Sequence, residues 1–482
     1  INIKNKGMKD NKLKEKNIFF GVGDIEDPKK SIYVKTVVFI EDSTIADLNF
    51  DYNCSPSLSP FLSKVCEKIK DLAQKSNLLD SVKISKELII EKLIKELGKT
   101  KVEDMIPTEE RAFLNLQIEK NEITDLPVKE KEIINLPVEE RNIINLPVEA
   151  FHRAVGDYIS RNEIKNIFPK NNKKVLIAMS GGVDSSVSAL LLSRQGYEVI
   201  GSTMRLYDLP LNEHNKYYSK SCCSILGLLD ARDVCRKLKL PHFTLDFRDI
   251  FKKNVVDYFI NQYLLGKTPN PCIMCNQYVK FRALINIAKK LGAPRIATGH
   301  YLRIKKDSNS KKFIIKRAKD KNKDQSYVFW TTNQEQLSKI ICPLGDYNKS
   351  EIREIAKNNN LGVARKTESQ DICFIPDGDY ADFIEENLNI KIQSGLIVDS
   401  DNNVLGKHKG FPFYTIGQRK GLGISYKEPL YVKKIIPETN TLIVGNSKQV
   451  MGKELTASNV NFIYLDKLES EMKVKAKIRY RD

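Results

Sequence analysis

The feature that most constrains the fold is an apolar segment, residues 175–179, that runs directly into the sequence Ser-Gly-Gly-Val-Asp-Ser-Ser at Ser180–Ser186. The apolar run predicts a buried strand, and residues 184–195, which end before Gly196, predict a helix. Two adjacent glycines allow a sharp turn that leaves backbone N–H groups uncovered, and the helix aims its positive N-terminal end at the same place. This unit is typical of a site that binds phosphate groups. An ordinary Gly-Gly turn is the alternative interpretation.

The pattern of a strand followed by a helix repeats through the middle of the chain. Further strands are predicted at 199–204, 242–247 and 295–299, and helices at 229–238, 249–264 and 277–291. Strands that alternate with helices predict an α/β fold with a doubly wound parallel sheet, whose ligand binds at the carboxyl ends of the strands. The Ser180–Ser186 loop, Met204 and Gly299 all fall at such ends, so we expect them to lie close together.

The two flanking regions differ from this middle part. Residues 1–171 contain a repeat of period ten in which Leu-Pro recurs at Leu126, Leu136 and Leu146. Because proline interrupts a helix, each unit can form only about two turns. We interpret the region as an N-terminal extension with a low-complexity spacer that catalysis does not need, and a docking surface for a partner is the alternative. After residue 376, short strands and Gly-rich turns predict a small central domain and a C-terminal β-barrel that is truncated. The expected domains are 1–171, 172–375, 376–430 and 431–482.

Charge and cysteine content bound the partners and the compartment. The formal net charge of +18 favours a polyanionic partner such as nucleic acid, although a general abundance of lysine explains such an excess equally well. Residues 473–480 alternate basic with apolar side chains and predict a half-buried strand with one basic face. Nine cysteines, an odd number, argue against a secreted disulfide framework and for a reducing compartment. No apolar run is long enough for a transmembrane helix, so we expect no membrane partner.

Two segments carry cysteines in settings that suggest chemistry. Cys272 and Cys275 form a Cys-x-x-Cys after two prolines, which stiffen and expose the loop. A thiol there, near a helix that we expect to begin at about residue 276, should have a lowered pKa and be nucleophilic. Redox, zinc and iron–sulfur sites all use this spacing. Cys373 lies between two apolar residues, and taken alone it is best interpreted as a buried structural cysteine.

The loop lacks the lysine of the pattern G-x-x-x-x-G-K-[ST] and instead resembles the PP-loop of ATP pyrophosphatases, which cleave ATP between the α and β phosphates. From about 174 to 482 the chain resembles the tRNA-specific 2-thiouridylase family, which replaces oxygen by sulfur at carbon 2 of the wobble uridine of some tRNAs. The motifs that carry the resemblance stand in family order: Ala-Met-Ser-Gly-Gly-Val-Asp-Ser-Ser (178–186), Thr-Pro-Asn-Pro-Cys-Ile-Met-Cys-Asn (268–276), Ala-Thr-Gly-His-Tyr (297–301), Lys-Asp-Gln-Ser-Tyr (323–327), Asp-Ile-Cys-Phe-Ile (371–375), Gly-Gln-Arg-Lys-Gly-Leu-Gly (417–423) and Arg-Tyr-Arg (479–481).

The resemblance implies a role for each matching residue. The ATP-binding residues would be Ala178, Met179, Ser180, Gly181, Gly182, Val183, Asp184, Ser185, Ser186, Met204 and Gly299. The tRNA-binding residues would be Asn270, Pro271, Cys272, His300, Lys323, Asp324, Gln325, Arg479 and Tyr480. Cys275 would be the nucleophile, Cys373 would carry a persulfide, and Asp184 would act in catalysis and hold magnesium. The target would be the wobble uridine of tRNAs of the Lys, Glu and Gln type, and the sulfur donor a cysteine desulfurase or a sulfur carrier.

One departure from familiar members leaves a second mechanism open. Cys272 stands where many members have Asp, so Cys272, Cys275 and Cys373 could hold an iron–sulfur cluster, although we favour a persulfide relay. Another PP-loop adenylating ligase or amidotransferase is an alternative function that needs no thiols, and a non-catalytic tRNA-binding protein would need neither the thiols nor Asp184. The Cys-x-x-Cys branch and the long extension lead us to expect an organelle matrix, plastid-type rather than mitochondrial, with the cytoplasm as the alternative.

Overall fold

The structure, a computed structural model, describes residues 19–27, 32–41, 44–53, 59–74, 76–82, 84, 88, 89, 92, 145–161, 170–207, 225–367, 372–375, 380–388, 391–452 and 454–476. Its centre is a parallel sheet with the strand order β10-β7-β4-β5-β6. The strands are β4 (Lys174–Ala178), β5 (Glu198–Arg205), β6 (His242–Asp246), β7 (Arg295–Ala297) and β10 (Ile340–Ile341). The doubly wound parallel sheet is therefore confirmed, and each of the four strands predicted from the sequence lies on one of these strands.

Strand β4 is central because its side chains alternate between two separate cores. Leu176 packs in the cluster on one face, whereas Val175 and Ile177 pack in the cluster on the other. Consecutive side chains of a strand point to opposite faces, so an apolar residue at every position requires cover on both sides. The strand order also reverses at β4, since β5 and β6 follow on one side and β7 and β10 on the other. Ligands of such sheets bind at this reversal, beyond the carboxyl ends of the strands.

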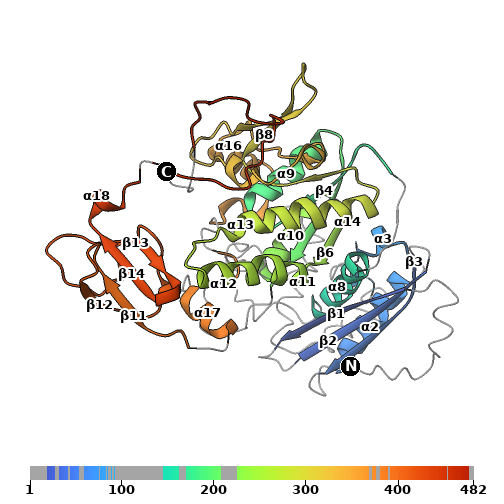
Figure 1. The fold of residues 1–482 in the computed structure, drawn as a ribbon. Helices are drawn as coiled ribbons and strands as arrows, with labels where there is room; N and C mark the ends of the chain where they lie inside the picture. Colours follow the sequence, from blue (N-terminus) through green and yellow to red (C-terminus); the bar gives the residue numbers. More distant parts are fainter. Residues whose placement is uncertain are drawn as a thin grey trace.

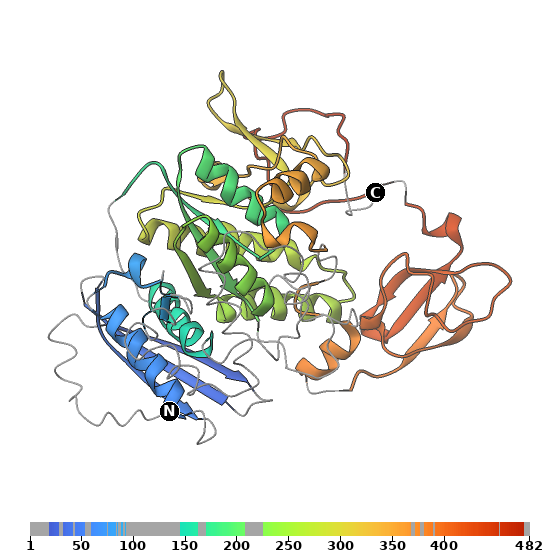
Figure 2. The same ribbon diagram turned by 180° about the vertical axis from the view of Figure 1, so that it is seen from behind.

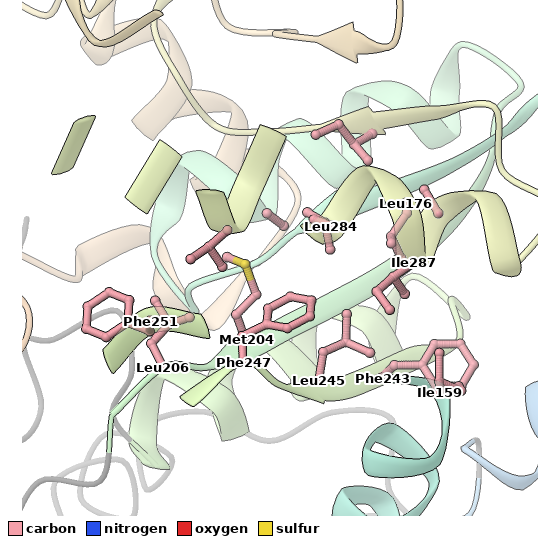
Figure 3. Packing of buried hydrophobic residues seen from close by; sticks show 14 of the residues in the cluster. Ile159, Leu176, Met204, Leu206, Phe243, Leu245, Phe247, Phe251, Leu284 and Ile287 are labelled. Carbon is pink, nitrogen blue, oxygen red and sulfur yellow. The ribbon is translucent and has the colours of Figure 1, made fainter. Parts of the chain in front are cut away.

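Helices cover both faces of the sheet (Figure 1). One face carries α9 (Val183–Arg194), α10 (Ile225–Lys237) and α16 (Lys349–Asn358), and the other carries α11 (Arg248–Phe251), α12 (Asp257–Leu264) and α14 (Leu284–Lys290). Figure 3 shows the core on the second face, where Met204 of β5 and Phe243 of β6 pack in one cluster with Ile287 of α14. Burial of each such side chain contributes roughly 1.5–3 kcal/mol, so this core fixes the strand ends at which the predicted site lies.

The N-terminal region holds more structure than the sequence predicted. Its elements are β1 (Phe19–Asp27), β2 (Ile32–Glu41), β3 (Thr44–Asn53), α2 (Ser59–Ala73), α3 (Leu78–Ser81) and α8 (Asn145–Arg161). The three strands form an antiparallel sheet in chain order. Helix α8 contacts β1 and β2 on one side and β6 on the other, so it joins this sheet to the central one (Figure 2).

Helix α8 covers the exposed edge that β6 would otherwise leave. Phe151, Val155 and Ile159 are fully buried in the same cluster as the central sheet. At Gly156 the two backbones meet so closely that a Cβ would lie 1.5 Å from the carbonyl oxygen of Thr244 in β6. Because only glycine leaves room for this approach, we infer that α8 is an integral part of the central fold and not a tethered spacer.

Only the last unit of the ten-residue repeat lies within the described residues. Helix α8 begins at Asn145, so Pro147 falls in the first turn, where its missing N–H group would have no partner in any case. No further proline follows until Pro169, and the helix continues for 17 residues. The prediction of about two turns is therefore wrong for this unit, and the earlier units lie outside the described residues.

A second small sheet forms the C-terminal part of the molecule. Its strands are β11 (Gly395–Val398), β12 (Val404–His408), β13 (Tyr431–Ile436) and β14 (Thr441–Gly445), preceded by α17 (Tyr380–Leu388) and followed by α18 (Ser447–Val450). They pair in the order β12-β11-β14-β13 around a core of their own. Both views place this sheet on the side of the central domain opposite to β1–β3 (Figures 1 and 2). No helix among the described residues combines the length and the apolar character needed to cross a membrane.

The strand predicted at 473–480 is wrong for its described part. Residues 471–476 form no strand, and Val474, which the alternation placed in the core, is 73% exposed. An alternating pattern becomes a strand only where a neighbouring strand accepts its backbone hydrogen bonds and covers its apolar face. Among the described residues no strand pairs with 471–476. Residues 477–480 lie outside the described residues.

Candidate active site

The Ser180–Ser186 loop turns the chain from β4 into α9. Gly181 has a φ of +67°, in the region that favours glycine, and Gly182 is the N-cap of α9. A Cβ on Gly181 would lie 2.0 Å from the carbonyl oxygen of Gly227 in α10. Conformation and space therefore both require glycine at position 181. The loop lies at the positive end of α9, as the interpretation of a phosphate-binding loop requires.

Serine hydroxyls hold the loop in this shape. The Ser185 hydroxyl accepts a hydrogen bond from the Ser180 N–H at 3.3 Å and donates one to the Gly182 carbonyl at 3.2 Å. The Ser186 hydroxyl donates to the same carbonyl at 2.8 Å. Ser185 is 5% exposed and Ser186 is fully buried, so their first role in this structure is to shape the loop. Their bonds to phosphate oxygens stay a prediction.

The two other predicted ATP contacts lie at neighbouring strand ends. Met204, next to last in β5, is 9% exposed. Gly299 follows β7, and a Cβ there would lie 2.9 Å from the Ser185 nitrogen and 3.0 Å from the Asp184 carbonyl carbon. The backbone after β7 therefore abuts the loop, and the structure brings Gly299 and the loop together as the sequence predicted.

Asp184 is the acidic group of the loop, and it is bound from two directions. The Nζ atom of Lys349, the first residue of α16, lies 2.7 Å from both carboxylate oxygens. The buried Tyr301 donates its hydroxyl to Oδ1 at 2.7 Å. The Lys349 side chain is 12% exposed and that of Asp184 is 31% exposed. The loop therefore carries a neutralised acid whose carboxylate still reaches solvent.

A second lysine reaches the loop from the segment after α16. The Nζ atom of Lys366 donates to the Gly181 carbonyl at 3.2 Å and to the Asp230 carboxylate of α10 at 2.6 Å. This arrangement ties the turn of the loop to the helix beside it. Lys366 thus places a positive charge at the loop while it also holds the Gly181 backbone.

Asp184 also fits the magnesium ion that the family resemblance implies. Magnesium commonly binds through one or two carboxylates together with phosphate oxygens and water. Among the described residues no group of three or more His, Cys, Asp or Glu side chains could hold a metal ion. A metal at this loop would therefore take Asp184 from the protein and its other ligands from the nucleotide and water.

Cys272 and Cys275 lie at the start of a helix that begins earlier than predicted. Helix α13 (Pro271–Met274) continues into a helical segment, Cys275–Ala283, and the side chain of Asn270 caps it by accepting from the Cys272 N–H at 3.1 Å. Cys272 is exposed, whereas Cys275 is 8% exposed and packs in the large core. The predicted exposed loop therefore holds for Cys272 only, because the asparagine cap starts the helix before Cys275.

Cys373 lies in a short turn that Phe374 anchors. The Phe374 ring is 1% exposed and meets Phe251 and Phe259 edge to face, each at 5.5 Å between ring centroids. It also lies 6.3 Å from the ring of Tyr207, which follows β5. Cys373 itself is half-buried against the same core. Cys373 is therefore not the fully buried side chain that its apolar neighbours suggested. Phe374 is the residue that anchors this turn in the core.

The cysteines do not form a cluster site in this structure. Cys272, Cys275 and Cys373 all belong to the described part of the chain, in which no three such ligands gather around a common point. Iron–sulfur chemistry is therefore not supported. Both cysteine segments nevertheless lie at the carboxyl edge of the central sheet, because Phe374 contacts Tyr207 after β5, and Phe281 lies 6.3 Å from His300 after β7.

Comparison with known proteins decides the family. A family model described as a tRNA methyl transferase HUP domain matches residues 173–377, and one described as a tRNA methyl transferase PRC-barrel domain matches 381–446. The tRNA-specific 2-thiouridylase MnmA of Acetivibrio thermocellus is 49% identical over 310 residues, which are 64% of this chain and 86% of that protein. The protein of the same name from Clostridioides difficile is 47% identical over 309 residues, 64% of this chain and 85% of its own. This chain belongs to the tRNA-specific 2-thiouridylase family.

Solved structures add little to this assignment. NMN synthetase from Francisella tularensis matches with a TM-score of 0.26 and 14% identity, over 41% of this chain and 66% of that one. So low a score carries no argument. The family assignment rests on the sequence matches, and the first family model matches from residue 173, just before β4.

Most residues that the 2-thiouridylase resemblance assigned to tRNA have internal partners. Asp324 is 5% exposed and accepts from the Ala318 N–H at 2.9 Å and from the Ser326 hydroxyl at 2.8 Å. The Gln325 side chain accepts from the Tyr301 N–H at 3.0 Å. Gln325 thus holds the backbone of Tyr301, whose hydroxyl contacts Asp184. Asp324 holds the backbone of Ala318. Contact of the Asp324 and Gln325 side chains with tRNA stays a prediction.

The other residues that the resemblance assigned to tRNA differ in how far they are exposed. His300 shares a 2.9 Å hydrogen bond with Thr298, and burial, together with the charge of Lys280, holds its pKa well below the usual value. Lys323 is half-buried. Arg479 and Tyr480 lie outside the described residues. Within the segment Asn270–Cys272, Asn270 and Cys272 are exposed at the start of α13, and Pro271 is buried.

Sequence reasoning missed the cations of this 2-thiouridylase-family site. Lys349 and Lys366 lie 165 and 185 residues after their partners in the loop. A lysine at the start of an amphipathic helix is common, so neither residue carries a local signal. Only the fold brings them to Asp184 and Gly181.

Proposed function

We propose that this protein is an ATP-dependent tRNA 2-thiouridylase that activates carbon 2 of the wobble uridine and replaces its oxygen with sulfur. What supports the proposal most is that the glycine loop and both cysteine segments lie at the same edge of the central sheet. The glycine loop follows β4, while the segments of Cys275 and Cys373 contact residues that follow β7 and β5. A nucleotide loop at the same sheet edge as two segments that carry cysteines fits a reaction that both adenylates a substrate and transfers sulfur to it.

The proposed reaction has two stages: adenylation of the uridine at the loop, and then sulfur transfer by the two thiols. The uridine O2 attacks the α phosphate of ATP, which forms an O–P bond and releases pyrophosphate. The terminal sulfur of a persulfide on Cys373 then attacks carbon 2, and AMP leaves with the oxygen. Cys275 attacks the Sγ atom of Cys373, which breaks the S–S bond, leaves sulfur on the uridine and joins the two cysteines in a disulfide. An external dithiol reduces the disulfide, and a sulfur donor reloads Cys373.

The charged groups of the loop serve the first step. Ser180–Ser186 would bind the phosphates through backbone N–H groups at the start of α9. Magnesium, bound by Asp184, would neutralise charge that develops on the departing pyrophosphate. Lys366 would keep the Gly181 turn open by holding its carbonyl.

The names of the two matching family models mention methyl transfer. Methyl transfer from a sulfonium donor needs neither a loop that binds the phosphates of ATP nor a pair of thiols. The thiols Cys275 and Cys373 therefore favour thiolation over methylation. The curated relatives from Acetivibrio thermocellus and Clostridioides difficile carry the thiouridylase name.

The remaining partners are proposed on the family resemblance. The substrates would be tRNAs of the Lys, Glu and Gln type, and sulfur would come from a cysteine desulfurase or a sulfur carrier protein. The Cys-x-x-Cys at Cys272 and Cys275 supports a plastid-type organelle, with the cytoplasm as the alternative.

A pyrophosphate-release assay tests the proposed function. We expect release from ATP only when unmodified tRNA is present, because the uridine oxygen is the attacking group. tRNA that already carries 2-thiouridine serves as the matched control and should give no release. Equal release with both tRNAs, or with none, would contradict the proposal.

A further inference from the structure

The nucleotide loop lacks a lysine of its own, and the fold supplies two from elsewhere. In the pattern G-x-x-x-x-G-K-[ST] the lysine that contacts the phosphates is part of the loop, whereas Ser180–Ser186 contains none. Lys349 and Lys366 instead contact Asp184 and the Gly181 carbonyl. The two lysines differ in what they hold: Lys366 binds the backbone of the loop together with Asp230 of α10, and Lys349 binds the acid of the loop.

The position of Lys349 is fixed by the start of α16. Asn348 and Glu351 form a reciprocal capping box around the first turn. The Lys349 N–H donates to the Asp320 carboxylate at 3.0 Å, and α16 packs against α9 in a common core. The backbone from which the Lys349 side chain extends is therefore held, while the four-carbon side chain can redirect its charge without moving the helix.

The ion pair between Asp184 and Lys349 neutralises a negative charge that would otherwise repel the phosphates of a nucleotide. A polyphosphate that approached a bare Asp184 would meet a like charge. In this structure Lys349 neutralises Asp184 with 2.7 Å contacts to both oxygens, at a place where the carboxylate is 31% exposed. A magnesium ion that arrives with the nucleotide would take over the carboxylate, since Asp184 is the ligand that the loop offers. Lys349 would then stand beside the phosphates with its charge available.

We propose that Lys349 is the phosphate-binding lysine of this site, and that Asp184 holds it in place until magnesium takes over the carboxylate. This inference deepens the proposed function, because it presumes that the loop binds ATP. Asp184 changes partner from an ammonium group to a metal ion, and the ammonium group changes partner from a carboxylate to a phosphate. Lys366 keeps its contacts throughout and acts as a positioning residue for Gly181.

The test measures the dissociation constant of ATP by calorimetry, without tRNA, in EDTA and in excess magnesium. In magnesium, Lys349→Met should weaken ATP binding at least about tenfold, which corresponds to loss of one charge-assisted hydrogen bond. Lys349→Arg, which keeps the charge, should lose less. The matched control is Lys319→Met, which removes an exposed ion pair with Glu351 on the same helix and should bind ATP as the parent does.

The Asp184→Asn variant separates an exchange of partners from a static ion pair. In EDTA this variant should bind ATP more tightly than the parent, because Lys349 is released and the like charge is gone, and magnesium should add little. The double variant D184N/K349M lacks the like charge too but has no lysine to offer, so it should keep only the smaller part of that gain. The inference is overturned if K349M binds magnesium-ATP like K319M, or if the gain of D184N is absent or survives undiminished in the double variant. If the parent protein binds no ATP at all, the proposed function fails instead.

Discussion

Two ion-paired acids of this protein, Asp184 in the nucleotide loop and Glu149 in α8, lie in opposite surroundings. Glu149 is 2% exposed and bound by Arg153 at 2.8 Å and by Arg232 of α10 at 2.6 Å. Asp184 is bound by Lys349 but remains 31% exposed. Burial alone would raise the pKa of Glu149, yet the charges of Arg232 and Arg153 outweigh it and hold that pKa below its usual value. The first pair joins two elements of the core, and the second lies at the site edge.

The comparison teaches which kind of pair supports folding and which can serve binding. A buried acid that loses its partners leaves charges stranded in the core, so its partners are fixed. An acid that reaches solvent can exchange one cation for another at small cost. We therefore expect substitutions near α8 to change stability, and substitutions at the loop edge to change activity or ligand affinity with the fold intact.

The largest expected effect is on activity, from substitutions of the two cysteines of the candidate site. Cys275→Ser or Cys373→Ser should lower thiolation at least a hundredfold, about 2.7 kcal/mol of barrier, because each thiol forms or breaks a bond to sulfur. Thermal unfolding should stay near that of the parent. The control is Cys342→Ala, since burial raises the pKa of the Cys342 thiol to about 12 and keeps it unreactive. Near-normal 2-thiouridine output from either serine variant would rule out the two-cysteine mechanism.

Removal of α8 tests how much this helix contributes to the stability of the central fold. The sequence suggested that residues before 170 are dispensable, but Phe151, Val155 and Ile159 are fully buried against the central sheet. We expect stability to fall in the order full chain, chain from 145, chain from 170, by several kcal/mol at the last step as these side chains are exposed. Urea unfolding of the three chains measures this order. A chain from 170 that is as stable and active as the full chain would show that α8 is an accessory.

A single substitution in α8 tests the contribution of its buried ion pair to stability. Glu149→Gln should destabilise the protein by about 3–5 kcal/mol, because it leaves Arg153 and Arg232 without their buried counter-charge. Glu67→Gln is the matched control: its side chain, 58% exposed, pairs with that of Lys64, 41% exposed, and loss of the pair should cost far less than loss of the buried one. Equal losses in the two variants would remove the distinction between buried and exposed pairs.

The smallest expected effect is a pH dependence of stability near α8. Burial, together with the charge of Arg232, holds the pKa values of His152 and His242 well below the usual value. The unfolded chain therefore binds more protons than the folded one at pH values below about 6.5, and stability should decrease as pH falls through that range. His152→Gln should reduce the slope in urea unfolding at several pH values. A stability that rises on acidification would contradict the assignment of neutral, buried histidines.

Local patterns predicted the strand β4, the loop and α9, because each of their signals lies within a few residues of the next. The long-range parts were not accessible in this way. Lys349 reaches Asp184 only because α16 packs beside α9, and α8 covers β6 only because Gly156 lets the backbones meet. The strand predicted near Val474 was wrong for the reverse reason: its alternation was a valid local signal, but no strand in the described part of the chain pairs with it.

The central claim is tested most directly by mass spectrometry of nucleosides from unmodified tRNA incubated with the protein, ATP, magnesium, a dithiol and a persulfide donor. The account predicts a uridine whose mass has increased by the exchange of one oxygen for one sulfur, with one AMP formed for each product. Omission of ATP, or the Cys373→Ser variant, should abolish this product. A uridine that gains instead the mass of a methyl group in the presence of a methyl donor, or a sulfur product that forms without ATP, would contradict it.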